Sequence, residues 1–348
     1  SSGGSFDEPN DPNRGDVHYW EVWHGNKPFS EYRKYFFRYA SEFGFQSFPS
    51  VKTLETVTDD PKELNPFSYV MEKHQRNYGG NGKIAKYMQA AYRYPENFSD
   101  FVYASQLLQA DGIRYGVEHY RRNRGRCMGA IYWQLNDCWP VISWSSIDYY
   151  GRWKALHYYA KRFFAPVMLS CEEQSWMTVE ADMNRQHFEF EKSIRLNVTN
   201  ETLDAHRVLV KWAVRKTDAT ILREEEQWLE VPALSAVWMD KVELPQIDCF
   251  NEYVSYEAWE NDQIISQGTV IFSYPKYFHY LNPGLAVRVD GDEIVVKAEA
   301  YAKSVEIRNE NDDLILEDNY FDMNAGEYRV KILDGKPDGL KVRSVYDI

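Results

Sequence analysis

Ser41-Glu42-Phe43-Gly44-Phe45-Gln46-Ser47-Phe48-Pro49-Ser50 is the stretch that decides the fold, because it joins a β-prone run to a turn at a single carboxylate. The run before it, residues 36–40, is rich in aromatic side chains, and the turn is rich in Gly, Ser and Pro. In an (α/β) barrel, strands end in this way at the face that carries the active site. A Glu at such a strand end can act as a nucleophile or as a general base. We therefore predict that Glu42 closes a barrel strand and faces a catalytic site.

Length and composition are those of an ordinary globular protein. The 348 residues are enough for two or three domains, and 44% hydrophobic and 27% charged residues are typical of this class. A net charge of −13 without a basic stripe argues against nucleic acid as a partner. Aromatic residues reach 16%, which fits either large cores or stacking against sugar rings. No run of 18 apolar residues occurs, so we expect no membrane-spanning helix and no membrane partner.

The four cysteines, Cys127, Cys138, Cys171 and Cys249, are too few and too scattered for a disulfide framework. They form no CxxC pair, and no Cys/His cluster has the spacing of a zinc site. We therefore expect neither a metal nor a disulfide framework. A reducing, cytoplasmic compartment is the default expectation, while a secreted or lysosomal location stays open.

Residues 1–166 alternate strand-like and helical stretches, which indicates a parallel α/β arrangement. Ser99 is expected to cap a helix that runs to about Arg122. Residues 129–133 are predicted to form a buried strand, because they are apolar with little alternation, as parallel strands are. A glycine-rich run at 79–83 is expected to be a flexible surface loop. The other expected elements are strands at 17–23 and 36–40 and a helix at 153–164.

Beyond residue 166, apolar and polar residues alternate with period two, as in strands that have one buried face. Ile194, Leu196 and Val198 form one such face, and the alternate residues from Val208 to Val214 form another. These runs recur at roughly 8–15-residue spacing, which favours β-sandwiches. We expect a barrel part at 1–166 and two sandwiches at 167–273 and 274–348, with one larger β domain as the alternative.

The stretch 41–50 resembles the segment that carries the nucleophile in the β-mannosidases of glycoside hydrolase family 2. A second segment agrees with it. Trp133-Gln134-Leu135-Asn136-Asp137-Cys138-Trp139-Pro140, with the residues that follow to Lys154, resembles the last barrel strand and loop of that family. By this resemblance Glu42 is the nucleophile and Trp133 is the platform under the terminal sugar. A core Trp that caps the barrel is the alternative for Trp133.

A third segment, Asp16-Val17-His18-Tyr19-Trp20-Glu21-Val22-Trp23-His24-Gly25, resembles the family's strand before the nucleophile strand. The resemblance implies that Trp20 lines the sugar pocket. It places His24 at the end of that strand, where a donor can contact the sugar or the nucleophile. Many relatives carry Tyr at that position, so an ordinary hydrogen-bonded His is the alternative.

One departure from the family pattern concerns the acid/base residue. In the family that Glu follows an Asn, on a strand well before the nucleophile. The glutamates ahead of Glu42 are Glu8, Glu21 and Glu31, and none of them follows an Asn. We therefore expect the chain to be the C-terminal half of a larger enzyme, with the missing N-terminal half as its partner, and to be inactive or incomplete alone.

The resemblance implies a multidomain protein, with a partial (α/β) TIM-type barrel followed by immunoglobulin-like all-β sandwich domains. It implies a retaining exo-β-mannosidase that hydrolyses terminal non-reducing β-D-mannose residues of oligosaccharides without a metal or organic cofactor. A homodimer stays open. Two alternatives remain: another exo-glycosidase of the family, such as an exo-β-glucosaminidase, and a non-catalytic carbohydrate-binding or scaffold chain.

Overall fold

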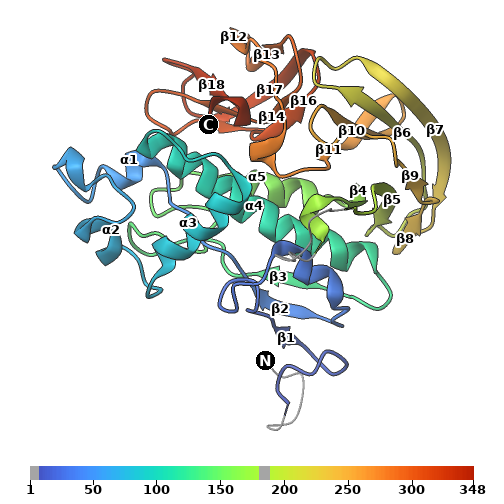
Figure 1. Ribbon diagram of the computed structural model, residues 1–348, viewed down its shortest axis with the longest axis horizontal. Coiled ribbons are helices and arrows are strands. Elements are labelled where there is room, and N and C mark those ends of the chain that lie inside the picture. Colours follow the sequence, from blue (N-terminus) through green and yellow to red (C-terminus); the bar gives the residue numbers. More distant parts are fainter. Residues whose placement is uncertain (1–7, 180–188) are drawn as a thin grey trace.

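A computed structural model describes residues 8–179 and 189–348 as a helix-rich part with a small sheet, followed by two all-β units (Figure 1). The α-helices of the described residues are α1 (Val51–Leu54), α2 (Tyr69–Lys73), α3 (Gly80–Ala91), α4 (Phe98–Arg122) and α5 (Ala155–Phe163). The long helix α4 crosses the middle of the molecule, with the small sheet on one side and the β units on the other (Figure 1). Helix α4 therefore lies between the small sheet and the β units.

The small sheet consists of three parallel strands in the order β1 (Val17–His18), β2 (Ala40–Phe43) and β3 (Ala130–Tyr132). This confirms the parallel α/β arrangement expected for the first part of the chain. A closed (α/β) barrel has eight strands, so the described residues contain part of a barrel. Within them, β1 and β3 are the two edge strands.

The first two strands differ in extent from the prediction. Glu42 lies in β2 as expected, but β2 begins only at Ala40, because residues 29–34 form a 3-10 helix and the aromatic run that follows leads away from it. β1 is shorter than the predicted 17–23, because the chain turns at Trp20, whose carbonyl oxygen accepts a hydrogen bond from the His24 amide at 2.7 Å.

Two predictions about helix starts are wrong. Asn97, not Ser99, caps α4, and its side chain accepts a hydrogen bond from the Asp100 amide at 3.0 Å. Ser99 already lies inside the helix. The expected loop at 79–83 is instead the start of α3, which begins at Gly80 after Gly79 adopts a φ of +71°. Glycine reaches this left-handed conformation without steric cost, so it can initiate the helix.

The strand predicted at 129–133 is confirmed as β3, but its predicted burial is wrong. Ile131 in the middle of β3 is 52% exposed. The described sheet ends at β3, so one side of this strand has no neighbouring strand there. An apolar pattern typical of a central strand therefore lies at an open edge.

The first β unit is a sandwich, as the period-two pattern predicts. One sheet has the order β11-β10-β6-β7, and the other has the order β4-β5-β8 with β9 beside β5. Ile194, Leu196 and Val198 are buried between them, together with alternate residues of β6. The strands are β4 (Val167–Gln174), β5 (Ser193–Asn200), β6 (His206–Lys216), β7 (Ile221–Val231), β8 (Ser235–Trp238), β9 (Val242–Glu243), β10 (Glu252–Glu260) and β11 (Gln263–Ile271).

The second β unit pairs a sheet of order β12-β13-β17-β15 with one of order β16-β14-β18. Its first two strands form a hairpin in which Asp290 pairs with Glu293 and Gly291 adopts a φ of +67°. The strands are β12 (Ala286–Asp290), β13 (Glu293–Ala298), β14 (Ala302–Arg308), β15 (Ile315–Leu316), β16 (Phe321–Met323), β17 (Gly326–Asp334) and β18 (Lys341–Arg343).

The hydrophobic core does not follow the order of the chain. Buried residues of the second β unit, such as Val305 and Phe321, join one continuous cluster with buried residues of α4 and α5, whereas the first β unit has a cluster of its own. The last unit therefore packs directly on the helix-rich part. The domain boundaries at 166 and 273 stay predictions.

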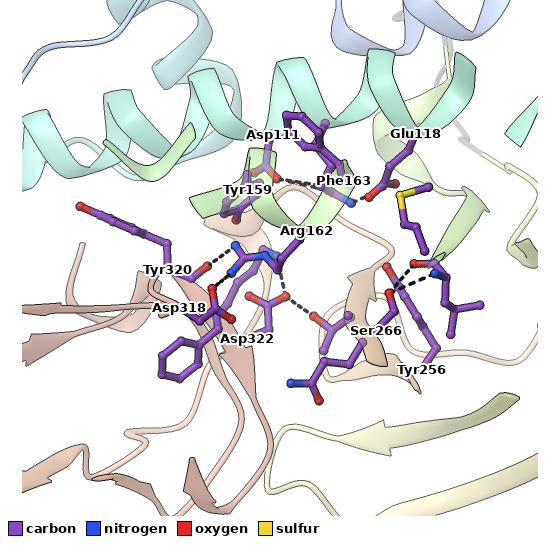
Figure 2. A pocket seen from close by; sticks show the side chains of 18 residues that line it. Asp111, Glu118, Tyr159, Arg162, Phe163, Tyr256, Ser266, Asp318, Tyr320 and Asp322 are labelled. Atoms are coloured by element: carbon purple, nitrogen blue, oxygen red, sulfur yellow. Dashed lines mark hydrogen bonds and ion pairs between the residues drawn. The ribbon is translucent and has the colours of Figure 1, made fainter. Parts of the chain in front are cut away.

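Charged side chains join all three parts at one place (Figure 2). Arg162 of α5 donates to Asp318 at 2.5 Å and to the carbonyl oxygens of Asn319 and Tyr320 at 3.1 Å. Lys303 lies 3.3 Å from Asp322, and this carboxylate also accepts from Thr269 of the first β unit. A cavity of about 80 Å³ lies among these residues. The three parts therefore share one buried polar junction.

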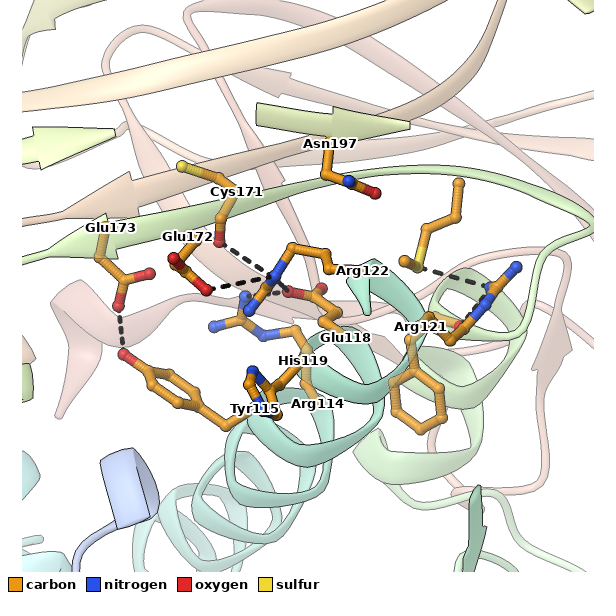
Figure 3. Close-up of polar contacts among 12 residues, drawn as sticks. Arg114, Tyr115, Glu118, His119, Arg121, Arg122, Cys171, Glu172, Glu173 and Asn197 are labelled. Carbon is orange, nitrogen blue, oxygen red and sulfur yellow. Dashed lines mark hydrogen bonds and ion pairs between the residues drawn. The ribbon is translucent and has the colours of Figure 1, made fainter. Parts of the chain in front are cut away.

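A second buried network joins α4 to β4 (Figure 3). The carboxylate of Glu173 accepts hydrogen bonds from Tyr115 and, at 2.7 Å, from Arg33 in the 3-10 helix before β2. Arg122, whose side chain is fully buried, lies 3.4 Å from Glu118 and 3.8 Å from Glu172. Buried charges are tolerated when they are paired in this way, so the network holds α4 against the first strand of the sandwich.

Candidate active site

Glu42 lies one residue before the end of β2, with its side chain 23% exposed. Its Oε1 accepts a hydrogen bond from the indole Nε1 of Trp20 at 2.9 Å. Its Oε2 lies 3.6 Å from Nδ1 of His18, which faces Glu42 across the register of β1 and β2. One oxygen of the carboxylate is thus held by a neutral donor, while the side chain keeps partial access to solvent.

Gly44 explains how the aromatic residues converge beside Glu42. A Cβ atom at this position would lie 2.4 Å from the carbonyl oxygen of Trp133 and 3.0 Å from Cη2 of Trp20. It would also lie 3.1 Å from Cδ1 of Trp144. A side chain larger than hydrogen would therefore push these groups apart, and Gly is the residue that allows the close approach.

Trp133 follows β3 directly and is 44% exposed. Its amide donates to the carbonyl oxygen of Phe43 at 2.8 Å, which places it next to the nucleophile candidate in the neighbouring strand. A half-exposed Trp at a strand end can present one ring face to a ligand. The structure therefore brings Trp20, Glu42 and Trp133 to the same end of the sheet.

The indole of Trp20 links His24 to Glu42. Its imidazole packs on the indole of Trp20, with ring centroids 5.3 Å apart. Partial burial and the nearby Lys83 ammonium lower the pKa of His24. Among the residues that the structure describes, His24 packs against Trp20, whose indole N–H in turn donates to Glu42.

Sequence reasoning missed His18 and Gly44, and it interpreted Trp144 as a structural residue. His18 stands two residues before Trp20 in the segment that was singled out, but its contact depends on the register between β1 and β2. Trp144 packs edge-on against Trp20, with ring centroids 6.1 Å apart. Gly44 carried a sequence signal, since a glycine directly after a strand end often marks a close backbone approach.

Residues 8–179 and 189–348 contain no group of three or more His, Cys, Asp or Glu side chains arranged to hold a metal ion. The helices in these ranges are too short or too polar to span a bilayer.

Two family profiles match the C-terminal β units. One, described as a Mannosidase Ig/CBM-like domain, matches residues 192–277, and the other, described as an Ig-fold domain, matches residues 280–348. Both profiles describe β-sandwich modules, as the structure shows for these residues.

Whole-chain comparisons extend the likeness to the first part. A "Beta-mannosidase B" from Thermothelomyces thermophilus is 30% identical over 95% of this chain, which spans 41% of that protein. The crystal structure of a β-D-mannosidase from Dictyoglomus thermophilum superimposes with a TM-score of 0.84 at 27% identity, over 98% of this chain and 41% of that one. An exo-chitosanase from Amycolatopsis orientalis has a TM-score of 0.63 at 16% identity, over 91% of this chain and 45% of that one, a likeness of fold alone.

The chain thus spans about two fifths of the length of the relatives it matches. The matches confirm the fold class expected from the sequence, a partial (α/β) barrel followed by immunoglobulin-like sandwiches. The residue roles at the end of the sheet stay predictions.

Proposed function

We propose that the whole protein to which this chain belongs removes terminal non-reducing β-D-mannose residues from oligosaccharides, with retention of configuration. The chain is related, over nearly its whole length, to the C-terminal part of the β-mannosidases of glycoside hydrolase family 2. One observation carries this proposal: the carboxylate of Glu42 stands at a barrel strand end, held by the Trp20 indole at 2.9 Å, beside the half-exposed Trp133.

Glu42 is the nucleophile in this proposal. Its free carboxylate oxygen attacks the anomeric carbon, the glycosidic bond breaks, and a second carboxyl group protonates the leaving oxygen. The same second group then takes a proton from water, which attacks the mannosyl-enzyme and releases mannose and Glu42. Trp20 orients the carboxylate through its N–H, which leaves the other oxygen to form the covalent bond.

Trp133 forms the platform for the terminal sugar, because an exposed indole face packs well against the C–H face of a pyranose ring. Trp20 bounds the same pocket. His24 acts as a positioning residue that supports the indole of Trp20. Nδ1 of His18 lies 3.6 Å from the other carboxylate oxygen of Glu42, which is beyond hydrogen-bond length, so this oxygen stays available for the attack.

The acid/base carboxyl group comes from a polypeptide outside residues 1–348. A retaining pair needs a second carboxyl group about 5–5.5 Å from the nucleophile, and in the family that this chain resembles that group is a Glu that follows an Asn, a pattern that none of the glutamates ahead of Glu42 shows. The open edges of β1 and β3 support a partner that continues the sheet, because unpaired strand edges readily add further strands.

The test is hydrolysis of p-nitrophenyl β-mannoside by this chain alone and by this chain mixed with the upstream half of the enzyme. We expect activity only in the mixture. Glu42→Gln should remove it, whereas Glu21→Gln, which changes an exposed carboxylate in the preceding turn, should not. Activity of the chain alone would show that a carboxyl group within it serves as acid/base.

The alternatives give different results in the same assay. An exo-β-glucosaminidase would cleave p-nitrophenyl β-glucosaminide and leave the mannoside intact. A carbohydrate-binding or scaffold chain would bind oligosaccharide without turnover in either sample, and Glu42→Gln would leave that binding unchanged.

A further inference from the structure

A cavity of about 510 Å³ lies between the helix-rich part and the second β unit. Its walls are the start of α1 at Ser50 and Val51, the loop 150–153, and residues of the last unit between 306 and 335. Trp20, Glu42 and Trp133 are not among its lining residues, so it is separate from the candidate active site. Its size falls within the ~300–1,000 Å³ of ordinary small-molecule sites.

Arg152 offers a hydrogen-bond donor at this cavity. Its guanidinium donates to Thr53 at 3.3 Å and to the carbonyl oxygen of Asn311 at 3.5 Å, both near the upper limit of hydrogen-bond length. Because neither bond is short, an acceptor in the cavity can compete for this guanidinium.

Asp312 offers an acceptor on the opposite wall. Its backbone φ is +51°, a left-handed conformation that is uncommon for residues other than glycine. The hydroxyl of Ser50 donates to its carboxylate at 2.8 Å, and burial raises the pKa of this carboxyl group. Asp reaches this conformation more readily than most residues, so the turn holds the carboxyl group at the cavity wall.

The charges around the cavity nearly balance. Glu306 and Arg343 form an ion pair, which removes one charge of each sign. The remaining charged side chains of the wall are Arg152, Arg308, Asp312, Asp313 and Asp334. An anion would meet three carboxyl groups and a cation would meet two guanidinium groups, so a neutral ligand with both donors and acceptors fits best.

Aromatic rings complete the wall. Tyr150 is 48% exposed, with the guanidinium of Arg152 5.6 Å from its ring centroid, and the partly buried Trp153 follows three positions later. Sugars combine an apolar C–H face with a rim of hydroxyl groups, which matches aromatic rings surrounded by alternating donors and acceptors.

We propose that this cavity is a second saccharide-binding site that takes a neutral manno-oligosaccharide. The choice of mannose rests on the proposed function, whereas the class of ligand follows from the cavity itself. On the side of the barrel part, its walls include Ser50 and Val51 after β2 and residues 150–153 after β3, together with residues of α4 and α5.

The test is isothermal titration of the protein with mannotriose, in a Glu42→Gln background that prevents turnover. Trp133→Ala is added to remove binding at the candidate active site. Under these conditions we expect one remaining saccharide site, which Tyr150→Ala and Asp312→Asn each weaken tenfold or more. Asn adopts left-handed φ values readily, so Asp312→Asn keeps the turn.

Tyr94→Ala is the matched control, because Tyr94 is 88% exposed and does not line the cavity. It should change the affinity less than twofold. Loss of all binding in Trp133→Ala, or equal affinities in the Tyr94 and Tyr150 variants, would overturn the proposal. Mannoside hydrolysis without binding at the cavity would refute the second site and leave the proposed function standing. Binding at the cavity without mannoside hydrolysis would support the second site and refute the proposed function.

Discussion

Glu42 depends on one neighbour for its orientation. Trp20 donates its indole N–H to the carboxylate at 2.9 Å, and His18 lies 3.6 Å away on the other oxygen. Hydrogen bonds to a charged group contribute about 1.5–3 kcal/mol, more than those between neutral groups. In the proposed mechanism, the indole N–H rather than the ring itself therefore orients the carboxylate of Glu42.

Trp20→Phe tests this role, because it keeps an aromatic ring and removes the N–H. In the assembled enzyme we expect kcat/KM for p-nitrophenyl β-mannoside to fall about 10- to 100-fold, the equivalent of one hydrogen bond to a charged group. Trp144→Phe is the control, since the Trp144 indole N–H has no hydrogen-bond partner in the described residues. Equal losses in the two variants would mean that ring packing alone matters.

His119 makes stability depend on pH. Burial, together with the nearby Arg122, lowers the pKa of His119 to about 3, while its Nε2 bonds to the carbonyl oxygen of Tyr35 at 2.8 Å. The unfolded chain therefore binds a proton between about pH 6.5 and 3 that the folded chain does not bind. The free energy of unfolding must fall as the pH is lowered through this window.

Urea unfolding at pH 7 and pH 5 measures this effect. We expect His119 to account for a loss of about 2 kcal/mol between the two pH values. His119→Gln should remove that share of the loss, whereas His279→Gln, at an exposed ring, should not. The same pH dependence in both variants would assign the loss to other groups.

At the scale of the element, β3 has an apolar sequence and an open edge. Ile131 at its centre is 52% exposed. If the upstream half continues the sheet, this residue becomes buried on assembly, and its exposure here reflects the unpaired edge rather than a solvent-adapted strand.

Ile131→Lys should therefore leave the urea midpoint of this chain nearly unchanged and abolish the mannosidase activity of the mixture with the upstream half. A charge buried at the new contact would lack a partner, which opposes assembly. Leu203→Lys, at a loop residue that is 82% exposed, should affect neither measurement. Full activity of the Ile131→Lys mixture would place the contact elsewhere.

At the scale of the whole molecule, three parts meet at the junction where Arg162 pairs with Asp318 and where Asp322 pairs with Lys303 and accepts from Thr269 (Figure 2). The second β unit also shares its hydrophobic core with α4 and α5. Unfolding of the last unit would therefore expose apolar surface of the helix-rich part, so we expect these two parts to unfold together.

Lys303→Met tests the junction. The change leaves the buried carboxylate of Asp322 without its cation. Removing one partner of a buried ion pair lowers the free energy of unfolding by about 3–5 kcal/mol. Arg329→Met breaks exposed pairs with Glu293 and Asp290 and should lower the stability far less, because exposed ion pairs are screened by solvent. Chemical denaturation measures both, and a small effect of Lys303→Met would show that Thr269 and the Ser304 amide suffice to stabilise Asp322.

The sequence by itself determined the features that depend on local pattern. The strand–turn stretch around Glu42 and the period-two runs beyond residue 166 indicated the partial barrel and the sandwiches. The segments around Trp20 and Trp133 indicated the family. Local pattern was enough because side-chain alternation and turn residues act over a few neighbouring positions.

Only the tertiary structure decided which distant residues meet. It paired His18 with Glu42 through strand register, exposed β3 at an edge, and joined Lys303 to Asp322 and Thr269 at the junction. It also opened the cavity between Arg152 and Asp312, which lie 160 positions apart. Such contacts arise from packing between elements, and a one-residue change of register would reverse which side chains face each other.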